Sequence, residues 1–184
     1  MDKHPLAAMN HLPTHEESMR LALAVARQAA ATDDVPVGAV VLDAEGQMIG
    51  QGVNRREADH DPSAHAEVVA LRLAGQASGN WRLDGCTLVV TLEPCAMCAG
   101  ALVSARIEQL VFGAYDQKAG AVGSRWDLVR DRRLNHRPEV VGGVLAAEST
   151  ELLQDFFASQ RMTAHAETRR IDGDDSATRF PRDT

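Results

Sequence analysis

Hydrophobic and polar positions follow two different periods along this chain. Apolar runs bounded by turn-forming residues predict strands at 37–42, 47–53, 86–92, 107–112 and 140–144. Apolar residues at helical spacing predict helices at 14–31, 64–74, about 95–104 and 148–161. Thr14 and Glu17 form a capping-box pattern at the start of the first helix. Strands and helices are therefore predicted from residue 14 to residue 161, with an irregular stretch at 113–137.

The order of these elements indicates an α/β fold. A turn at 43–46 joins the first two strands into a hairpin, and strands alternate with helices after it. Such an order places helices on both sides of one sheet of about five strands, and the hairpin makes that sheet mixed rather than parallel. We expect the folded domain at 14–163, an N-terminal extension at 1–13 and a polar, disordered tail at 164–184.

Composition limits the possible partners. The 184 residues are 45% hydrophobic, which allows one domain with a sizeable core. The net charge of −7 and the pI of about 5.4 argue against a nucleic-acid partner, because Lys and Arg make phosphate contacts. A local basic patch can still exist in an acidic chain. The best candidates for one are Lys118, Arg125, Arg130, Arg132, Arg133 and Arg137.

The chain also lacks signals for membranes or export. It contains no apolar stretch of about 18 residues and no basic-then-apolar pattern at its start. We therefore expect a cytoplasmic protein without a membrane partner. Its three cysteines are an odd number, which in a reducing compartment favours metal binding or catalysis over a disulfide framework.

Two short segments carry the candidate chemistry, and each is predicted to open a helix. They are His65-Ala66-Glu67 and Pro94-Cys95-Ala96-Met97-Cys98. Cys95 and Cys98 share one helical face, and the helix start favours their thiolates. Two thiolates and the His65 imidazole suit Zn²⁺ and leave its fourth position for water, as in catalytic zinc sites. Cys86 lies in an apolar strand pattern and is predicted to be core.

Glu67 is the candidate proton carrier. Water on such a zinc has its pKa lowered to about 7, and a base must then relocate its proton. On a regular helix Glu67 faces away from His65, which makes it a poor co-ligand. Its long side chain can still reach over the bound water.

Each segment alone has a simpler explanation. A CxxC pair is often half of a structural zinc site or a redox pair, and HxE occurs by chance. Both together, each opening a helix, are much more specific for a catalytic zinc site. A zinc module that only binds RNA or another protein is the alternative from a different class, and the presence of Glu67 argues against it.

At these residues the chain resembles the cytidine-deaminase-like superfamily and, within it, the bacterial tRNA-specific adenosine deaminases of the TadA type. The resemblance extends from about residue 15 to 161. It rests on VPVGAVV at 35–41, Asn54-Arg55, HDPSAHAE at 60–67, VTLEPCAMCAGAL at 90–102, VFGAYD at 111–116 and NHRPEV at 135–140.

The resemblance implies a three-layer α/β/α cytidine-deaminase-like sandwich and a function. One zinc per subunit would be held by His65, Cys95 and Cys98, with Glu67 as proton shuttle. The reaction would convert adenosine to inosine at the wobble position of a tRNA anticodon, in a homodimer that contacts the anticodon arm. Asn54 would hydrogen-bond the bound nucleotide.

Two further residues of the VFGAYD segment, Tyr115 and Asp116, are placed near the substrate by the same resemblance. Tyr115 either stacks on a flanking base or anchors the loop. The runner-up function is a deaminase of the same superfamily that acts on a free base or nucleoside, such as guanine, cytosine or cytidine. The acidic pI favours that alternative, whereas the extended match favours tRNA.

Overall fold

One mixed sheet organises the structure. The computed structural model describes residues 12–174, with side chains up to residue 163 apart from that of Ala30. The strands are β1 (Gly38–Leu42), β2 (Met48–Val53), β3 (Thr87–Leu92), β4 (Gln109–Ala114) and β5 (Glu139–Gly142). Their order is β2-β1-β3-β4-β5; β1 is antiparallel to β2 and β3, whereas β3, β4 and β5 are parallel. The predicted mixed sheet of five strands is confirmed.

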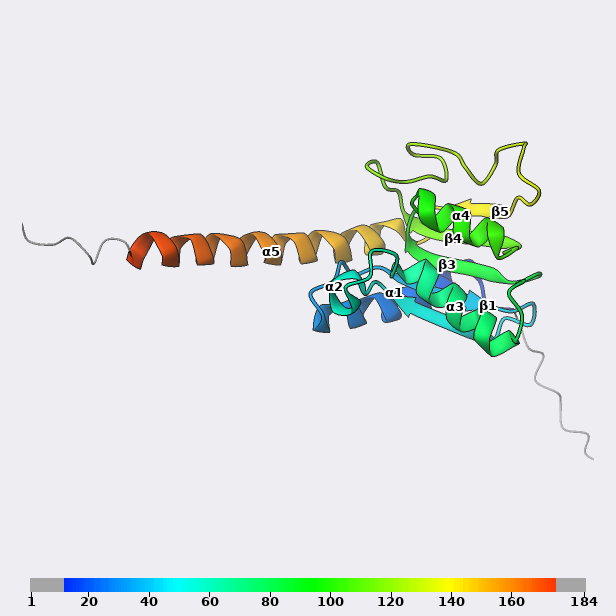
Figure 1. Ribbon diagram of the computed structural model, residues 1–184, viewed down its shortest axis with the longest axis horizontal. Coiled ribbons are helices and arrows are strands. Elements are labelled where there is room, and N and C mark those ends of the chain that lie inside the picture. The colour runs from blue at the N-terminus through cyan, green and yellow to red at the C-terminus, as the bar shows by residue number, and fades with distance from the viewer. Residues whose placement is uncertain (1–11, 175–184) are drawn as a thin grey trace, which may run out of the picture.

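Helices cover both faces of this sheet, which confirms the three-layer sandwich (Figure 1). The long helices are α1 (His15–Ala26), α3 (Ala66–Ser78), α4 (Ala96–Ser104) and α5 (Ala146–Asp174), with α2 (Arg56–Asp59) and a 3₁₀ turn (Arg27–Ala31) between them. The helices α3 and α4 share one core cluster with the sheet. On the other face, α1 and the start of α5 pack against a second cluster.

The central strands are apolar on both sides because both faces are covered. In β1, Val41 belongs to the core beneath α3 and α4, whereas Val40 belongs to the core beneath α1. Alternation along a strand sends successive side chains to opposite faces, so a strand buried on both faces becomes a continuous apolar run. All five residues of β1 are buried accordingly.

Two glycines in β2 allow α3 to approach the sheet closely. A Cβ at Gly52 would lie 2.2 Å from the carbonyl oxygen of Ala66, and one at Gly50 would lie 2.5 Å from that of Ala70. Both are contacts with helix backbone, which no side-chain movement relieves. The start of α3, and with it residue 65, is therefore positioned by this packing.

Several boundaries differ from the predicted ones. The first helix becomes 3₁₀ after Ala26, and α3 continues to Ser78, where Gly79 adopts the left-handed conformation that ends helices. The short helix α2 lies between the strand predicted at 47–53 and the helix predicted at 64–74, where no element was predicted. Four residues are too few for a periodic pattern to reveal.

The last helix also runs further than predicted, to Asp174 instead of about Arg161. Ala, Glu and Arg beyond residue 161 are good helix formers despite their polar composition. Gln160 on α5 donates a hydrogen bond to the Asp33 carboxylate at 3.0 Å. The domain boundary that we expected near 163 therefore falls inside this helix. Residues 164–174 are helical, whereas we expected the disordered tail to begin at residue 164. Residues 1–11 of the predicted extension and 175–184 of the predicted tail lie outside the described residues.

The structure adds one observation about membranes. Among residues 12–174, no helix combines the length and the apolar character needed to cross a bilayer.

Candidate active site

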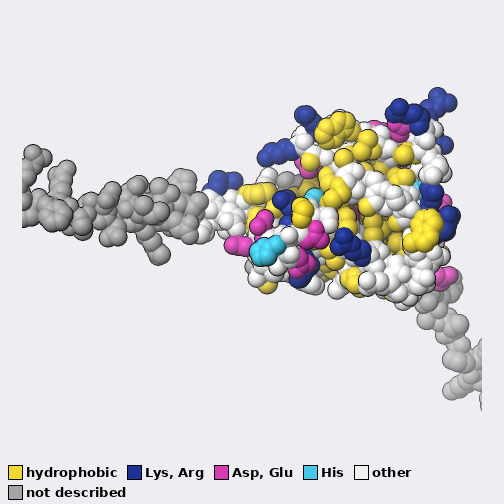
Figure 2. Space-filling view, in the orientation of Figure 1, with side chains coloured by type: hydrophobic (Ala, Val, Ile, Leu, Met, Phe, Trp, Pro, Cys, Tyr) yellow, Lys and Arg dark blue, Asp and Glu magenta, His cyan; other side chains and the backbone are white. Residues whose placement is uncertain are grey.

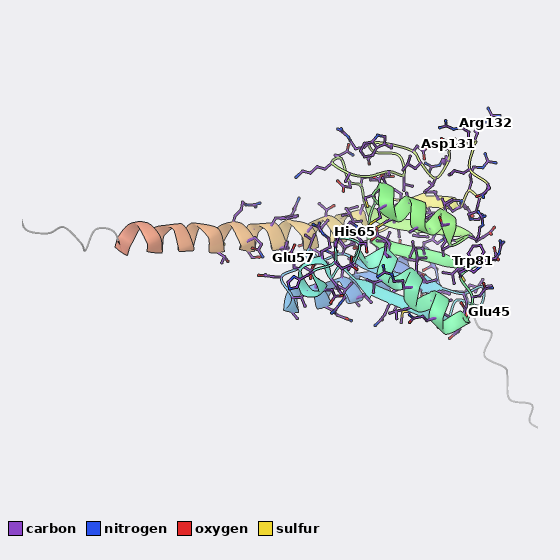
Figure 3. The ribbon with its side chains drawn as sticks, in the orientation of Figure 1. Glu45, Glu57, His65, Trp81, Asp131 and Arg132 are labelled. Carbon is purple, nitrogen blue, oxygen red and sulfur yellow. The ribbon has the colours of Figure 1, made fainter. Side chains whose placement is uncertain are left out.

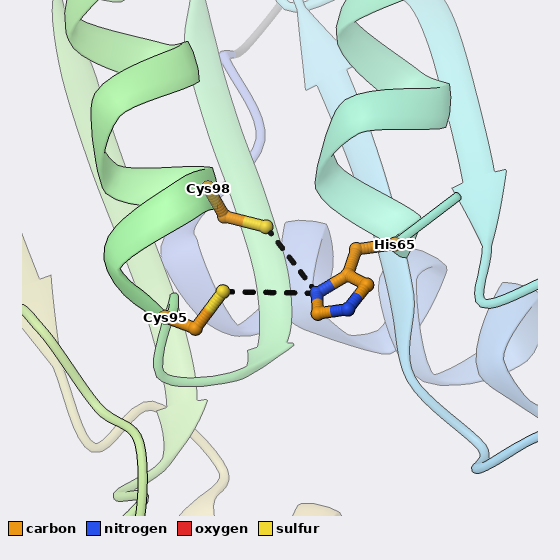
Figure 4. Close-up of side chains that lie close together, drawn as sticks. All are labelled: His65, Cys95 and Cys98. Atoms are coloured by element: carbon orange, nitrogen blue, oxygen red, sulfur yellow. Dashed lines mark hydrogen bonds between the residues drawn. The ribbon is translucent and has the colours of Figure 1, made fainter. Parts of the chain in front are cut away.

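Three metal-binding side chains meet where α3 and α4 begin side by side (Figure 4). His65 Nδ1 lies 3.7 Å from Cys95 Sγ and 3.6 Å from Cys98 Sγ, and the three ligand atoms lie within 4.8 Å of one another. A sulfur and a nitrogen bound to one tetrahedral zinc, at about 2.3 Å and about 2.0 Å, are about 3.6 Å apart. The cluster therefore has the spacing of a zinc site.

The backbone at the two helix starts determines this arrangement. It differs from our expectation that Cys95 and Cys98 share one face of a helix. Cys95 is not in the helix but is the extended N-cap residue of α4 (φ −72°, ψ 175°), with Cys98 in the first turn. An N-cap side chain lies over the first turn of its helix, so Cys95 and Cys98 meet without sharing a helical face. His65 is likewise the extended N-cap residue of α3 (φ −72°, ψ 151°).

The extended conformation of His65 also places Glu67 in the site. On a regular helix the two side chains would face apart, but an extended residue breaks that rule at its own position. Glu67 is only 4% exposed and lines the same pocket as His65. Burial raises the pKa of its carboxyl group. The expectation that the two side chains face apart is therefore wrong, whereas the role of Glu67 as the base stays a prediction.

The thiols are electrostatically unequal. Hydrogen bonding to the Cys98 side chain and then to His65 lowers the pKa of Cys95 to about 3, against the effect of burial. The same contact with Cys95, together with burial, raises the pKa of Cys98. The two sulfurs thus favour sharing one proton, and zinc binding displaces that proton because its ligands must be deprotonated.

A pocket of about 170 Å³ lies over these side chains. Asn54, which is 8% exposed, and Asp116 both contribute to its lining, as the sequence analysis placed them near the substrate. Tyr115 does not line it. The Tyr115 ring packs edge-on against Phe112 with centroids 5.1 Å apart, and the residue remains 56% exposed. This geometry favours the loop-anchor interpretation of Tyr115, with one face open to solvent.

Comparison with known proteins agrees with this geometry. The family model of the cytidine and deoxycytidylate deaminase zinc-binding region matches residues 12–114, which include His65, Cys95 and Cys98. A tRNA-specific adenosine deaminase of Haemophilus influenzae is 49% identical over 146 residues, which make up 79% of this chain and 84% of that protein. The chain belongs to the tRNA-specific adenosine deaminase family. It is a zinc-dependent deaminase.

Solved structures similar to this deaminase come from proteins with two different activities. A structure from work on A-to-I editing by tRNA:A34 deaminases at the wobble position of transfer RNA has a TM-score of 0.71 and 44% identity, and covers 74% of this chain and 98% of its own. A guanine deaminase of Nitrosomonas europaea has a TM-score of 0.67 and 27% identity, and covers 85% of this chain and 100% of its own. The shared fold therefore does not by itself select the substrate.

The pocket of the deaminase contains residues that the sequence analysis did not single out. Arg56 and Glu93 line it, along with the apolar side chains of Val35, Val37, Leu92 and Ala119. Glu93 could have been noticed from its position directly before Pro94-Cys95. No pattern marks Arg56, because it precedes the zinc ligand His65 by a loop whose path only the structure reveals.

Two of the six residues in the basic stretch that we considered for phosphate contacts are paired with acids of the same stretch. Arg130 pairs with Asp127 at 3.0 Å, and Arg133 forms a close ion pair with Asp131. Figure 3 shows Asp131 and Arg132 at the outer end of their loop, well separated from His65. Residues 130–133 are therefore poor candidates for contacting the nucleotide in the pocket, whereas Lys118 lies between the pocket residues Asp116 and Ala119.

Proposed function

We propose that this deaminase hydrolyses adenosine to inosine at the wobble position of a tRNA anticodon. The observation that carries the proposal is a base-sized pocket beside the zinc-ligand side chains. It lies in a chain that is 49% identical to a tRNA-specific adenosine deaminase. A volume of about 170 Å³ is below the roughly 300 Å³ at which sites for larger ligands begin. A single flipped base can enter, and the rest of the polynucleotide stays outside. Anticodon bases are unpaired, which lowers the cost of flipping.

The zinc ligands, Glu67, Asn54 and Asp116 each have a role in this reaction. Zinc held by His65, Cys95 and Cys98 would supply a water of lowered pKa. Glu67 would accept a proton from that water and deliver it to the ring nitrogen N1, while the hydroxide adds to C6. Glu67 would then carry the hydroxyl proton to the exocyclic amine, and the C6–N bond breaks to release ammonia. Asn54 hydrogen-bonds the nucleotide that carries the base, and Asp116 forms part of the pocket lining. Water and adenosine are thereby converted to inosine and ammonia.

Arg56 is the side chain best placed to contact an RNA phosphate. The neighbouring Arg55 is held by Asp59 through two hydrogen bonds of 2.8 and 2.6 Å. Arg56 is exposed at the lining of the pocket, and within residues 12–174 it has no hydrogen bond or ion pair of its own. Its guanidinium is therefore available to a phosphate next to the flipped base.

A homodimer is the proposed assembly, through the face formed by α3 and α4. Figure 2 shows hydrophobic side chains gathered on this face, with Lys and Arg mostly at its edges. Grooves of about 530 Å³ and 490 Å³ flank α4; Trp81 lines the first, and Leu128 lines the second. Exposed apolar patches of this kind commonly mark protein interfaces. The cytoplasmic location stays a prediction.

A free base or nucleoside is the alternative substrate. The net charge of −7 and the similarity to a guanine deaminase both favour it. Ammonia release from adenosine, guanine, cytosine and cytidine, measured beside release from an anticodon stem-loop RNA, separates the two functions. We expect release only from the RNA. Release from a free base or nucleoside alone would retain the zinc chemistry and transfer the substrate to the alternative.

A further inference from the structure

A second buried carboxylate, Glu93, lies beside the pocket and is not used by the reaction described above. It follows β3 directly, is 2% exposed, and its backbone N–H donates to the Ala114 carbonyl at 2.8 Å. A carboxylate taken out of water is costly unless hydrogen bonds replace its hydration. The partners of Glu93 therefore indicate what it does.

Those partners all come from one loop. The carboxylate accepts backbone hydrogen bonds from Asp116 at 3.1 Å, Val122 at 2.9 Å and Ser124 at 3.0 Å, and it also accepts a close hydrogen bond from the Ser124 hydroxyl. Both oxygens are used, Oε1 by Val122 and Ser124 and Oε2 by Asp116 and the hydroxyl. Residues 116–124, which we call the wall loop, thus converge on a single side chain.

The fit between Glu93 and the wall loop leaves no spare space. A Cβ at Gly120 would lie 2.5 Å from the Glu93 carboxylate, so the loop passes directly over it. Ala121 donates a hydrogen bond to the Pro94 carbonyl at 2.8 Å, and Gly120 bridges to Cys95. The wall loop is therefore attached to the same turn that carries a zinc ligand.

The wall loop also contributes to the pocket. Asp116 and Ala119 line it together with Val35, Val37 and Asn54. Within the loop, the Asp116 side chain accepts backbone hydrogen bonds from Lys118 at 2.8 Å and Ala119 at 3.2 Å. Holding the Asp116 backbone thus also holds the segment that faces the bound base.

We propose that Glu93 is a positioning residue, which holds the wall loop at a fixed distance from the zinc ligands and thereby sets the width of the base pocket. Although Glu93 lines the pocket, both of its carboxylate oxygens are already bound by the wall loop, and it therefore acts through that loop. Its contribution is to keep Asp116 and Ala119 in place before substrate arrives. Loss of this contribution weakens substrate binding much more than it slows the chemical step, because Glu67 and the zinc ligands remain in position.

Glu93→Gln tests this role, because the amide keeps the size of the side chain but offers one acceptor oxygen instead of two. At least one backbone N–H of the wall loop then faces an NH₂ group and loses its hydrogen-bond acceptor. We expect unchanged zinc content, a KM about tenfold higher, as for one lost hydrogen bond to a charged group, and a kcat within about threefold. Hydrogen exchange should accelerate at the amides of residues 116–124.

Two sets of variants control this test. The first is Asp43→Asn. The Asp43 carboxylate accepts hydrogen bonds from two backbone N–H groups in the β1–β2 turn, at the opposite end of β1 from the pocket. This substitution should leave KM unchanged. If Glu93→Gln does not fold, Ser124→Ala removes one donor alone and should raise KM about threefold, whereas Ser124→Thr keeps the hydroxyl and should restore it.

The outcomes separate this inference from the proposed substrate on which it rests. If the wild-type protein deaminates a free base instead of RNA, the same comparison is made with that base. Loss of zinc in Glu93→Gln would make the residue a support of the metal site and overturn the proposal. Faster exchange of the wall loop with an unchanged KM, or no change in either, would overturn it as well.

Discussion

At the scale of single residues, the chemistry depends on side chains placed just ahead of helices. His65 and Cys95 are extended N-cap residues, and Glu67 and Cys98 lie in the first turns that follow. Helix starts offer unpaired N–H groups and a positive end of the helix dipole, which stabilise thiolates. Residue types and spacing therefore identified the zinc ligands from sequence, whereas the orientation of Glu67 needed the observed backbone of His65.

Replacement of Glu67 separates metal binding from turnover. Glu67→Ala should retain zinc, because His65, Cys95 and Cys98 are the side chains that converge on the metal position. Loss of a general acid and base lowers kcat by about 10²–10⁴-fold. Zinc content and deamination rate measured on the same preparation check this. Turnover at the wild-type rate would remove Glu67 from the mechanism.

Arg56 makes a second prediction at this scale. Arg56→Ala should raise KM for the RNA and reduce the slope of log K against log salt by about 0.7–0.9, as for one lost phosphate contact. A titration of KM against salt concentration measures both. Arg20→Ala is the matched control, because Arg20 is exposed on α1 and paired with Glu16. Equal effects of the two substitutions would show that only total charge matters.

At the scale of elements, periodic patterns predicted what local sequence determines. The buried strands and the helices around them were found because each carries an apolar run of its own period. The wall loop has no period, and the partners of Glu93 lie 23 to 31 residues further along the chain. Contacts of that separation arise only from the folded topology, so sequence reasoning left Glu93 without a role.

The packing of α3 on β2 gives a prediction for this scale. In Gly52→Ala the new Cβ would meet the helix backbone at Ala66, so α3 must move and carry His65 with it. We expect a loss of about 1–3 kcal/mol in stability and weaker zinc binding. Thermal unfolding and zinc titration measure these effects.

Gly100→Ala is the control for that substitution. A Cβ at Gly100 in α4 meets no atom within 4 Å among the described residues, so alanine should be neutral or stabilise by up to about 1 kcal/mol. Equal stability losses in the two variants would contradict the role of close packing between α3 and β2.

At the scale of the whole molecule, the proposed dimer face predicts a defined association. Trp81→Glu or Leu128→Glu, each in a groove beside α4, should convert a dimer to a monomer in sedimentation experiments. Leu21→Glu is the control, because Leu21 is 42% exposed on α1 at the other face of the sheet. A wild-type protein that sediments as a monomer at every concentration would contradict the proposed dimer.

The reaction itself provides the most direct test. The zinc-loaded protein is incubated with an unmodified tRNA whose anticodon begins with adenosine, and the product is sequenced for inosine. We predict inosine at the wobble position with the wild-type protein, and at least about a hundredfold less in the same time with Glu67→Ala that still holds zinc. An unchanged tRNA, with wild-type protein that carries one zinc per chain, would contradict the assignment of tRNA as the substrate.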